Sequence, residues 1–278
     1  KSLIMYKAKK GIGGVVGFLL KLIVSAIFIF PFLWMLSLAL QSDMDITKLT
    51  IIPKQPTLQN FANAWRLAPF GTYLKNSVII IIAIVVLQTL VMVPAAYAFA
   101  KFDFKGKGVL FGVVLIAFMM PTQVTFIPIY HMMAGFGWTN TLLPQILPFM
   151  TNAFGIFLLR QYFMQVPDEL IEAARLDNAN EAQVLARIML PMSKPGISAI
   201  ALLSFVGHWN DYFWPLIMTN SDFIRPITIG VSRLKDTEGN DQWNLIMAGN
   251  MFLVLPILLM YIFASKYIIN SFAYSGIK

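Results

Sequence analysis

The sequence predicts an all-α polytopic membrane protein with six transmembrane helices. The composition is the first reason: 58% of the residues are hydrophobic, 12% are charged, and the mean hydropathy is +0.71, far from the profile of a soluble domain. The second is the recurrence of uncharged stretches that could cross a bilayer core about 30 Å thick, which takes roughly 20 mostly apolar residues. The third is one densely charged segment: seven of the twenty residues from 168 to 187 carry charge.

Five long stretches are almost free of charge. These stretches are residues 22–42, 76–100, 108–159 and 242–265, together with 195–218, which only Asp211 interrupts. The 52-residue stretch contains AGFGWTNT, in which Gly135, Gly137 and Asn140 favour a turn, so we divide it in two. We therefore expect one transmembrane domain over 1–278, with spans at about 15–40, 76–100, 108–130, 142–160, 196–218 and 244–266, and a loop at 161–195.

The basic residues orient these spans, because Lys and Arg that flank a span are retained in the cytoplasm. With the N-terminus inside, fourteen of the 21 Lys and Arg residues fall in cytoplasmic segments and seven fall outside. We therefore expect both termini and the 161–195 loop to be cytoplasmic, and the absence of Cys suits a bacterial inner membrane. The net charge of +8 then reflects topology and membrane lipid, and not nucleic-acid binding. The first apolar run is too long for a signal peptide and is expected to stay as a span.

The sequence gives little support for catalysis. It contains no Cys, and its only histidines are His131 and His208, so we expect no metal site and no catalytic triad. It also lacks a G-x-x-x-x-G-K-[ST] phosphate loop, since FKGKGV has neither the first Gly nor the Ser or Thr. We predict no enzymatic activity and no cofactor in this chain.

The charged segment has the pattern of two short helices joined by a turn. Pro167 suits the first position of a helix, and Asp168 and Glu169 complement the positive end of the helix dipole. Asn178 can adopt the left-handed conformation that ends a helix. Asn180, with Gln183 three residues later, resembles a capping box that begins a second helix, which Pro191 and Pro195 should end. One face of the first helix carries Leu170, Ala173, Ala174 and Asp177.

The spacing within this segment resembles a known family. Glu172-Ala173-Ala174, then position 178, then Ile188, Leu190 and Pro191 match the pattern EAA-x3-G-x9-I-x-L-P. The pattern is that of the cytoplasmic loop of ABC importer permeases, and the chain is similar to the smaller permease of the carbohydrate type. WNDYFWPL, QWN and the terminal INSFAYSGIK extend the resemblance. Asn178 stands where the family usually has Gly, and we expect Asn to keep the turn.

The resemblance implies a type I ABC importer permease whose helix–turn–helix loop couples it to an ATPase. Two ATPase subunits would bind ATP and Mg, and a second homologous permease and an extracytoplasmic solute-binding protein would complete the assembly. The residues implied in coupling to the ATPase are Glu172, Ala173, Ala174, Asp177, Asn178, Ile188, Leu190 and Pro191, with Gly276 and Lys278 of the C-terminal tail. Glu172 would pair with a basic residue, and the two alanines would permit close packing.

Polar side chains inside the predicted spans are candidates for a translocation path, since they are costly in hydrocarbon unless partnered. Ser204, His208 and Asp211 would share one stripe of the fifth span. We predict that the path is lined by Gln123, Asn152, His208, Trp209, Asp211, Trp214 and Asn250. The alternative is that these residues form hydrogen bonds between helices, or that the tryptophans belong to the aromatic belt of the membrane.

The predicted outer loop at 220–244 is rich in charge, and either it is a solvated hairpin or, as the resemblance implies, it docks the binding protein. Its candidate docking residues are Arg225, Arg233, Lys235 and Glu238. Two other functions stay open: a subunit of an ion-gradient-driven secondary transporter, with Asp211 as its one clear intramembrane carboxylate, and a non-transport assembly or sensor subunit. The first lacks a visible inverted repeat, and the second lacks a soluble input domain.

Overall fold

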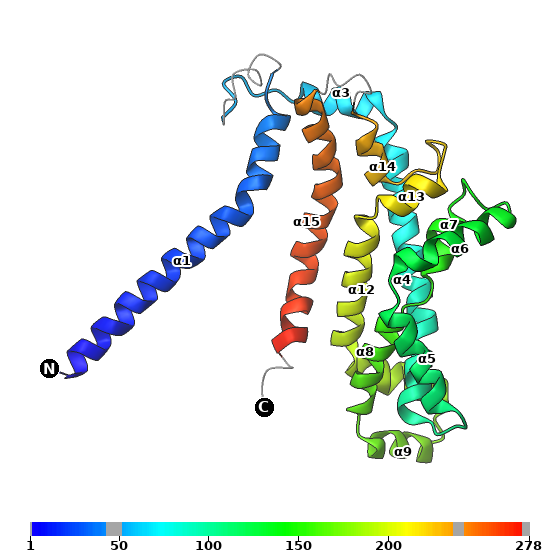
Figure 1. Ribbon diagram of the computed structural model, residues 1–278. Helices are drawn as coiled ribbons and strands as arrows, with labels where there is room; N and C mark the ends of the chain where they lie inside the picture. Colours follow the sequence, from blue (N-terminus) through cyan, green and yellow to red (C-terminus); the bar gives the residue numbers. More distant parts are fainter. Residues whose placement is uncertain (1, 43–51, 236–241, 274–278) are drawn as a thin grey trace. The chain divides into compact units, whose positions relative to one another are not determined.

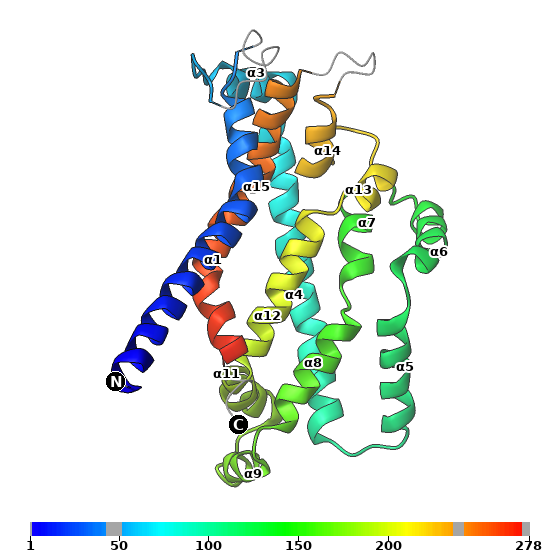
Figure 2. The same ribbon diagram turned by 60° about the vertical axis from the view of Figure 1, so that its left-hand side comes forward.

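The computed structural model describes residues 2–42, 52–235 and 242–273 of the 278-residue chain. Every regular element within these ranges is a helix (Figures 1 and 2). The predicted all-α fold is therefore confirmed for the part of the chain that is described. The chain divides into two compact units, one formed by Lys1–Ala68 and Arg233–Val254, the other by Pro69–Ser232 and Leu255–Lys278.

Three long helices coincide with predicted spans. Helix α1 (Ser2–Ala39) contains an apolar stretch at Gly17–Ala39, α4 covers Phe70–Lys101, and α15 (Trp243–Ala273) contains one at Trp243–Ile262. Among the described residues these are the helices long and apolar enough to cross a membrane unbroken. The number rises to five if each of two bent helix pairs is one span. The chain thus has the helices of a membrane protein, and the expected number of six spans remains a prediction.

The third, fourth and fifth predicted spans are each divided into shorter helices in the structure. The range 108–130 holds α5 (Lys107–Met119) and α6 (Thr122–Gly135), bent by 98°. Pro121 explains the break, because a proline ring disfavours the helical conformation of the preceding residue, and Met120 is indeed extended, with ψ 123°.

The fourth and fifth predicted spans break at capping side chains. The range 142–160 holds α7 (Leu143–Ile146), a 3-10 turn η1 (Leu147–Phe149) and α8 (Ala153–Met164). Asn152 is extended and accepts a 2.8 Å hydrogen bond from Gly155 N. The range 196–218 holds α12 (Lys194–Trp209) and α13 (Phe213–Met218), and between them Asp211 accepts a 3.2 Å bond from Trp214 N. Asn152 is therefore the N-cap residue of α8, and Asp211 lies one residue before the N-cap of α13, so neither lies within a continuous helix.

Helix α4 is the centre of the larger unit, where it packs against α8, α12 and α14 (Ile227–Ser232). A buried apolar cluster joins Met92 and Ala96 of α4 to Leu159 and Phe163 of α8 and Ile200 of α12. In Figures 1 and 2 this group of helices has α9 (Asp168–Leu176) at one end and α13 and α14 at the other. Lipid is as apolar as these side chains, so close packing, and not the hydrophobic effect, holds spanning helices together.

The smaller unit is held together by amide side chains beside the end of α1. Asn60 of α3 (Gln59–Leu67) donates hydrogen bonds of 2.9 and 2.8 Å to the carbonyls of Ala39 and Gln41. Asn244, in the first turn of α15, donates to Asn60 Oδ1 at 3.3 Å. These bonds satisfy carbonyl groups that the end of a helix leaves unpaired.

Close packing between α12 and α8 yields a stability prediction. A Cβ atom added to Gly196 would lie 2.6 Å from Cδ2 of the Tyr162 ring, whereas one added to Gly207, on the same helix, would meet nothing within 4 Å. We expect Gly196→Ala to destabilise the protein by about 1–3 kcal/mol through overpacking. Gly207→Ala should be neutral or slightly stabilising, because alanine is the better helix former by about 1 kcal/mol. Thermal unfolding in detergent measures both, and equal midpoints would contradict the packing.

Candidate functional site

The charged segment begins with a helix whose charges complement its dipole. Helix α9 has Asp168 and Glu169 in its first turn and Arg175 in its last. A charge whose sign is opposite to that of the adjacent end of the helix dipole stabilises the helix by about 0.3–1 kcal/mol. Pro167 is the N-cap residue and not the first helical residue, so the helix begins one position later than the sequence indicated.

The turn after α9 closes as the sequence predicted. Asn178 has φ 59°, the left-handed conformation that glycine usually supplies. The N–H of Asn178 donates to Arg175 O, and the N–H of Ala179 donates to Ala174 O, both at 3.0 Å. These two bonds form the Schellman motif that satisfies the last carbonyls of a helix. Asparagine therefore does keep the turn at the position where the family pattern has glycine.

The second helix begins at a complete capping box. Asn180 Oδ1 accepts from Gln183 N, and Gln183 Oε1 accepts from Asn180 N, both at 2.9 Å. The helix ends between Pro191 and Pro195 as expected: α10 (Glu181–Val184) continues through a π turn, η2 (Leu185–Met189), into α11 (Leu190–Met192). A proline within an α-helix clashes with the carbonyl four residues before it, and the wider π turn relieves that crowding.

Buried side chains fix both helices to the larger unit. Ile171 of α9, Val184 of α10 and Met189 of η2 are each at most 3% exposed and belong to the same apolar cluster as Phe163 of α8. Because the inner face of α9 is set by Ile171, its opposite face points away from the unit. The loop is therefore a firmly packed part of this unit.

Polar bonds connect the same loop to the last turns of α4. Tyr97 donates its hydroxyl hydrogen to Glu181 Oε2 at 2.6 Å, and Glu181 Oε1 also pairs with Arg175 at 2.9 Å. Lys101 donates from Nζ to Val166 O and to Asp168 Oδ1, both at 2.6 Å. The Lys101 side chain is 8% exposed, so the bonds compensate a charge that burial would otherwise make costly.

The exposed face of α9 differs in part from the predicted face. Glu172, Ala173 and Asp177 are exposed as expected, whereas Ala174 packs against the buried cluster. Leu176, which the sequence analysis did not single out, is 84% exposed and extends the outward face. Among the described residues the Glu172 carboxylate has no hydrogen bond or ion pair. We call the surface formed by Glu172, Ala173 and Leu176 the α9 face.

The remaining predicted coupling residues fall into three groups. Ile188 and Leu190 pack against the buried cluster and so support the loop from within. Asn178 and Pro191 are exposed. Gly276 and Lys278 lie outside the described residues.

One predicted path residue, Asn152, and Ser204 of the fifth-span stripe are joined to a residue that was not predicted, Gln88. Ser204 donates to Gln88 Oε1 of α4, and Asn152 Nδ2 lies 3.4 Å from Ser204 Oγ. Gln88 Nε2 donates to Phe149 O at 2.9 Å. This network links three helical segments, in agreement with the alternative that such residues form bonds between helices. Gln88 stands alone in a strongly apolar stretch, and its isolation there is the one signal that could have found it.

A second group of path residues surrounds a small cavity. His208, Asp211 and Trp214 line it together with Gln145 and Phe149, and its volume of about 20 Å³ holds about one water molecule. Within the described part of the chain, Gln145 Oε1 is buried and accepts no hydrogen bond. Trp214 is itself buried, and its Nε1 donates to Pro144 O at 2.7 Å.

The other predicted path residues are not among those that line this cavity. Trp209 is 2% exposed and stacks on Phe205, so its ring does not face an open channel in this chain. Gln123 is exposed on α6. Asn250 belongs to the smaller unit and donates to Ile246 O of its own helix at 2.9 Å. Among the described residues, no three His, Asp or Glu side chains gather into a possible metal site.

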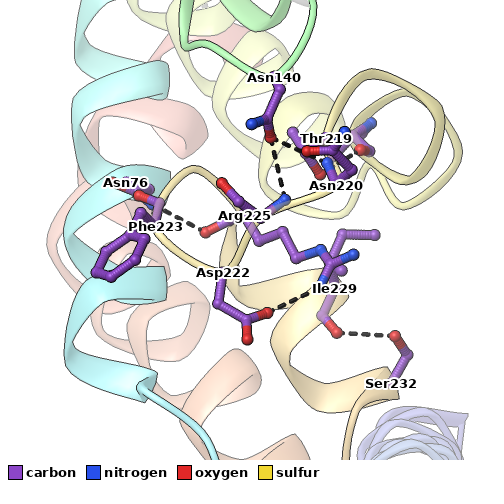
Figure 3. A network of polar contacts seen from close by, with 11 residues as sticks. Asn76, Asn140, Thr219, Asn220, Asp222, Phe223, Arg225, Ile229 and Ser232 are labelled. Atoms are coloured by element: carbon purple, nitrogen blue, oxygen red, sulfur yellow. Dashed lines mark hydrogen bonds and ion pairs between the residues drawn. The ribbon is translucent and has the colours of Figure 1, made fainter.

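The segment 219–227 is tied to its surroundings by side chains that bond backbone atoms (Figure 3). Asn76 of α4 donates to Phe223 O at 2.8 Å and to Arg225 O at 3.0 Å. Asn140, with φ 58°, accepts 3.0 Å bonds from the N–H groups of Asn220 and Ser221. The turn therefore has a defined shape, and it presents Phe223, which is 82% exposed.

The predicted docking residues are placed differently from one another. Arg225 pairs with Asp222 at 2.7 Å, and its side chain is only 16% exposed, so it is mainly a structural residue of this turn. Arg233 and Lys235 are exposed, and they flank the turn in sequence. Glu238 lies outside the described residues.

The left-handed turn of the loop gives a second prediction. Asn178→Gly should leave the free energy of unfolding unchanged or slightly raised, because glycine adopts φ 59° without strain. Asn178→Val should lower it by about 1–2 kcal/mol, since a left-handed conformation is costly for a residue with a larger side chain. Denaturation of the purified chain in detergent measures both variants, and an equal loss in both would argue against the conformational reason.

The similarity to known proteins covers most of the chain and includes the charged loop. Residues 92–272 match the family described as binding-protein-dependent transport system inner membrane component. An arabinooligosaccharides transport system permease protein of Halalkalibacterium halodurans is 32% identical over 92% of this chain and 93% of its own length. An sn-glycerol-3-phosphate transport system permease protein of Yersinia pestis is 32% identical over 75% of this chain and 76% of its own.

Solved structures share the fold. A bacterial ABC transporter involved in the import of the acidic polysaccharide alginate has a chain that superposes with a TM-score of 0.82 at 23% identity, covering 93% of this chain and 97% of that one. A chain of the bacterial alginate transporter in complex with an alginate pentasaccharide-bound periplasmic protein gives a TM-score of 0.61 at 17% identity, covering 93% and 95%. The matched region contains the loop with Glu172, and the chain belongs to the family of binding-protein-dependent transport system inner membrane components.

Proposed function

We propose that this chain is the permease subunit of an ATP-driven importer and forms the translocation path for a sugar or a related solute. The α9 face carries the proposal, because an unpaired carboxylate, a small side chain and an exposed leucine stand together on a helix fixed from behind by Ile171. Such a surface suits a groove on another protein. The names of the relatives, which transport arabinooligosaccharides and sn-glycerol-3-phosphate, support a carbohydrate or polyol-type solute.

The proposed partners follow from the family and the α9 face. Two ATPase subunits would bind ATP and Mg, with the 161–195 loop of this chain on one of them. A second homologous permease would complete the membrane part, in a bacterial cytoplasmic membrane with both termini inside and six spans in this chain. A solute-binding protein outside would deliver the solute, and the complex of the alginate transporter with its periplasmic protein supports that partner. We propose that it docks near Arg233 and Lys235, and that Phe223 contributes an apolar contact.

A subunit of a secondary transporter is less well supported. The family described by dependence on a binding protein matches most of the chain. Asp211, the carboxylate that ion coupling would need, is used to cap α13. We therefore expect uptake to require ATP and to persist when ion gradients are dissipated.

Two substitutions of Asp211, which lines the small cavity, test the proposed solute path. Asp211→Asn keeps an oxygen that can accept from Trp214 N and removes only the charge, whereas Asp211→Ala removes both. If the charge faces the solute or its water, Asp211→Asn should slow solute uptake at least fivefold in reconstituted importer whose assembly is unchanged. Normal uptake by Asp211→Asn together with impaired uptake by Asp211→Ala would assign Asp211 to helix capping alone.

Purification of this chain with its partners, with and without a substitution on the α9 face, tests the whole proposal. We expect tagged purification of this chain from its native membranes in mild detergent to recover an ATPase and a second permease, identified by mass spectrometry. Glu172→Ala should deplete the ATPase at least fivefold, because an unpaired carboxylate is removed from the contact. Asp103→Ala is the matched control, since Asp103 is exposed and lies outside the loop. Recovery of the chain alone, intact in all versions, would contradict the importer assignment.

A further inference from the structure

Helix α4 is bound by side chains at both of its ends. Near its C-terminal end Tyr97 and Lys101 bond the charged loop at Glu181, Asp168 and the Val166 carbonyl. Near its N-terminal end, Asn76 donates to two carbonyls of the 219–227 segment, and Ser77 Oγ accepts from Ile227 N at 2.9 Å. Asn76 and Tyr97 are about 32 Å apart along the helix axis, at 1.5 Å per residue.

The contacts at the loop end are charge-assisted, and they are made by α4 side chains that are themselves largely buried. Tyr97 is 4% exposed, and its ring packs edge-on against Phe102 and Phe163 at 5.2 and 6.2 Å between centroids. A hydrogen bond from a hydroxyl to a carboxylate is roughly twice as strong as one between neutral groups, and more so away from water. Because Glu181 also holds Arg175, a single hydroxyl contact connects α4 to both helices of the loop.

The charged loop is also joined to α12 by the chain itself, but this connection is less direct than the side-chain contacts to α4. The charged loop continues into α12 near Pro191 and Pro195, the prolines predicted to end its second helix. The structure has a bend of 78° there, between Glu181–Met192 and α12. A sharp bend can change its angle without moving the helix beyond it. Helix α4, by contrast, is helical from Phe70 to Lys101, with Pro94 inside it, and so joins the contacts at its two ends through a single helix.

We propose that Tyr97 is a positioning residue that transmits movement of the loop to α4, and that Asn76 passes this movement to the 219–227 segment. The inference rests on the proposed function, in which the loop receives movement from an ATPase. It assigns to one continuous helix the communication between the α9 face and the segment that presents Phe223. Neither Tyr97 nor Asn76 needs to contact the solute.

The test uses the complete importer reconstituted in lipid vesicles, with ATP hydrolysis and solute uptake measured in the same sample. Tyr97→Phe removes only the hydroxyl that bonds Glu181. We expect normal recovery of the ATPase, ATP hydrolysis within about twofold of the parent, and at least fivefold less solute imported per ATP. Tyr162→Phe is the matched control, because this tyrosine lies on α8 nearby and no hydrogen bond of its hydroxyl is present among the described residues. Its import per ATP should equal that of the parent.

Asn76→Ser shortens the side chain that holds the far segment and should lower import per ATP in the same way. If both residues act through α4, the double variant should be no worse than the poorer single variant. Losses that multiply, or an unchanged import per ATP in Tyr97→Phe, would overturn the proposal. Loss of the ATPase from the Tyr97→Phe complex would also overturn it, since the hydroxyl would then be needed for assembly.

A fluorescent label follows the transmission itself. The chain has no cysteine, so Phe223→Cys provides its single labelling site. In an importer whose partner chains are also free of reactive thiols, we expect ATP to change the emission of the label and Tyr97→Phe to abolish that change. An undiminished change in Tyr97→Phe would contradict the inference. A parent importer that takes up solute without hydrolysing ATP would instead contradict the proposed function.

Discussion

The contact between the last turns of α4 and the charged loop is the constraint on which the position of the α9 face, the proposed coupling surface, depends. Tyr97 and Lys101 form hydrogen bonds with three separate points of the loop. Tyr97 also belongs to the apolar cluster that contains Ile171 and Met189 of the loop. The α9 face can present an unpaired carboxylate because the opposite side of the helix is fixed in this way. If either the buried cluster or the polar bonds were missing, a nine-residue helix with these charges would be marginal by itself.

The need to give every buried polar group a hydrogen-bond partner also explains where the helices break. A helix that ends inside an apolar bundle leaves N–H and carbonyl groups without partners, which is costly where water is absent. Asn152 and Asp211 each satisfy a freed N–H group with their own side chains, and Asn76 satisfies carbonyls of the 219–227 segment. The polar residues of these stretches thus make irregular backbone possible beside the small cavity. A solute path through this region would use groups that the fold already needs.

The sequence predicts local features of the loop better than it predicts the spans. The left-handed Asn178 and the capping box of Asn180 follow from chemistry within a few residues, and both are confirmed. Hydropathy does not reveal the breaks near Pro121, Asn152 and Asp211, because the few polar residues beside each break do not interrupt the long apolar stretches that contain them. The role of Gln88 depends on Ser204, which is far away in sequence, and no local pattern reveals it.

Site-specific photo-crosslinking from α9 in native membranes is the most direct measurement of whether this helix meets an ATPase. A photoreactive amino acid at Leu176, which is 84% exposed, would report the neighbour of the α9 face, and the same residue at Phe223, which is 82% exposed, would report the opposite end of the unit. We predict an adduct with an ATPase subunit from position 176 and none from position 223. Absence of an ATPase adduct from position 176, or equal adducts from both positions, would contradict the assignment of the α9 face as the coupling surface.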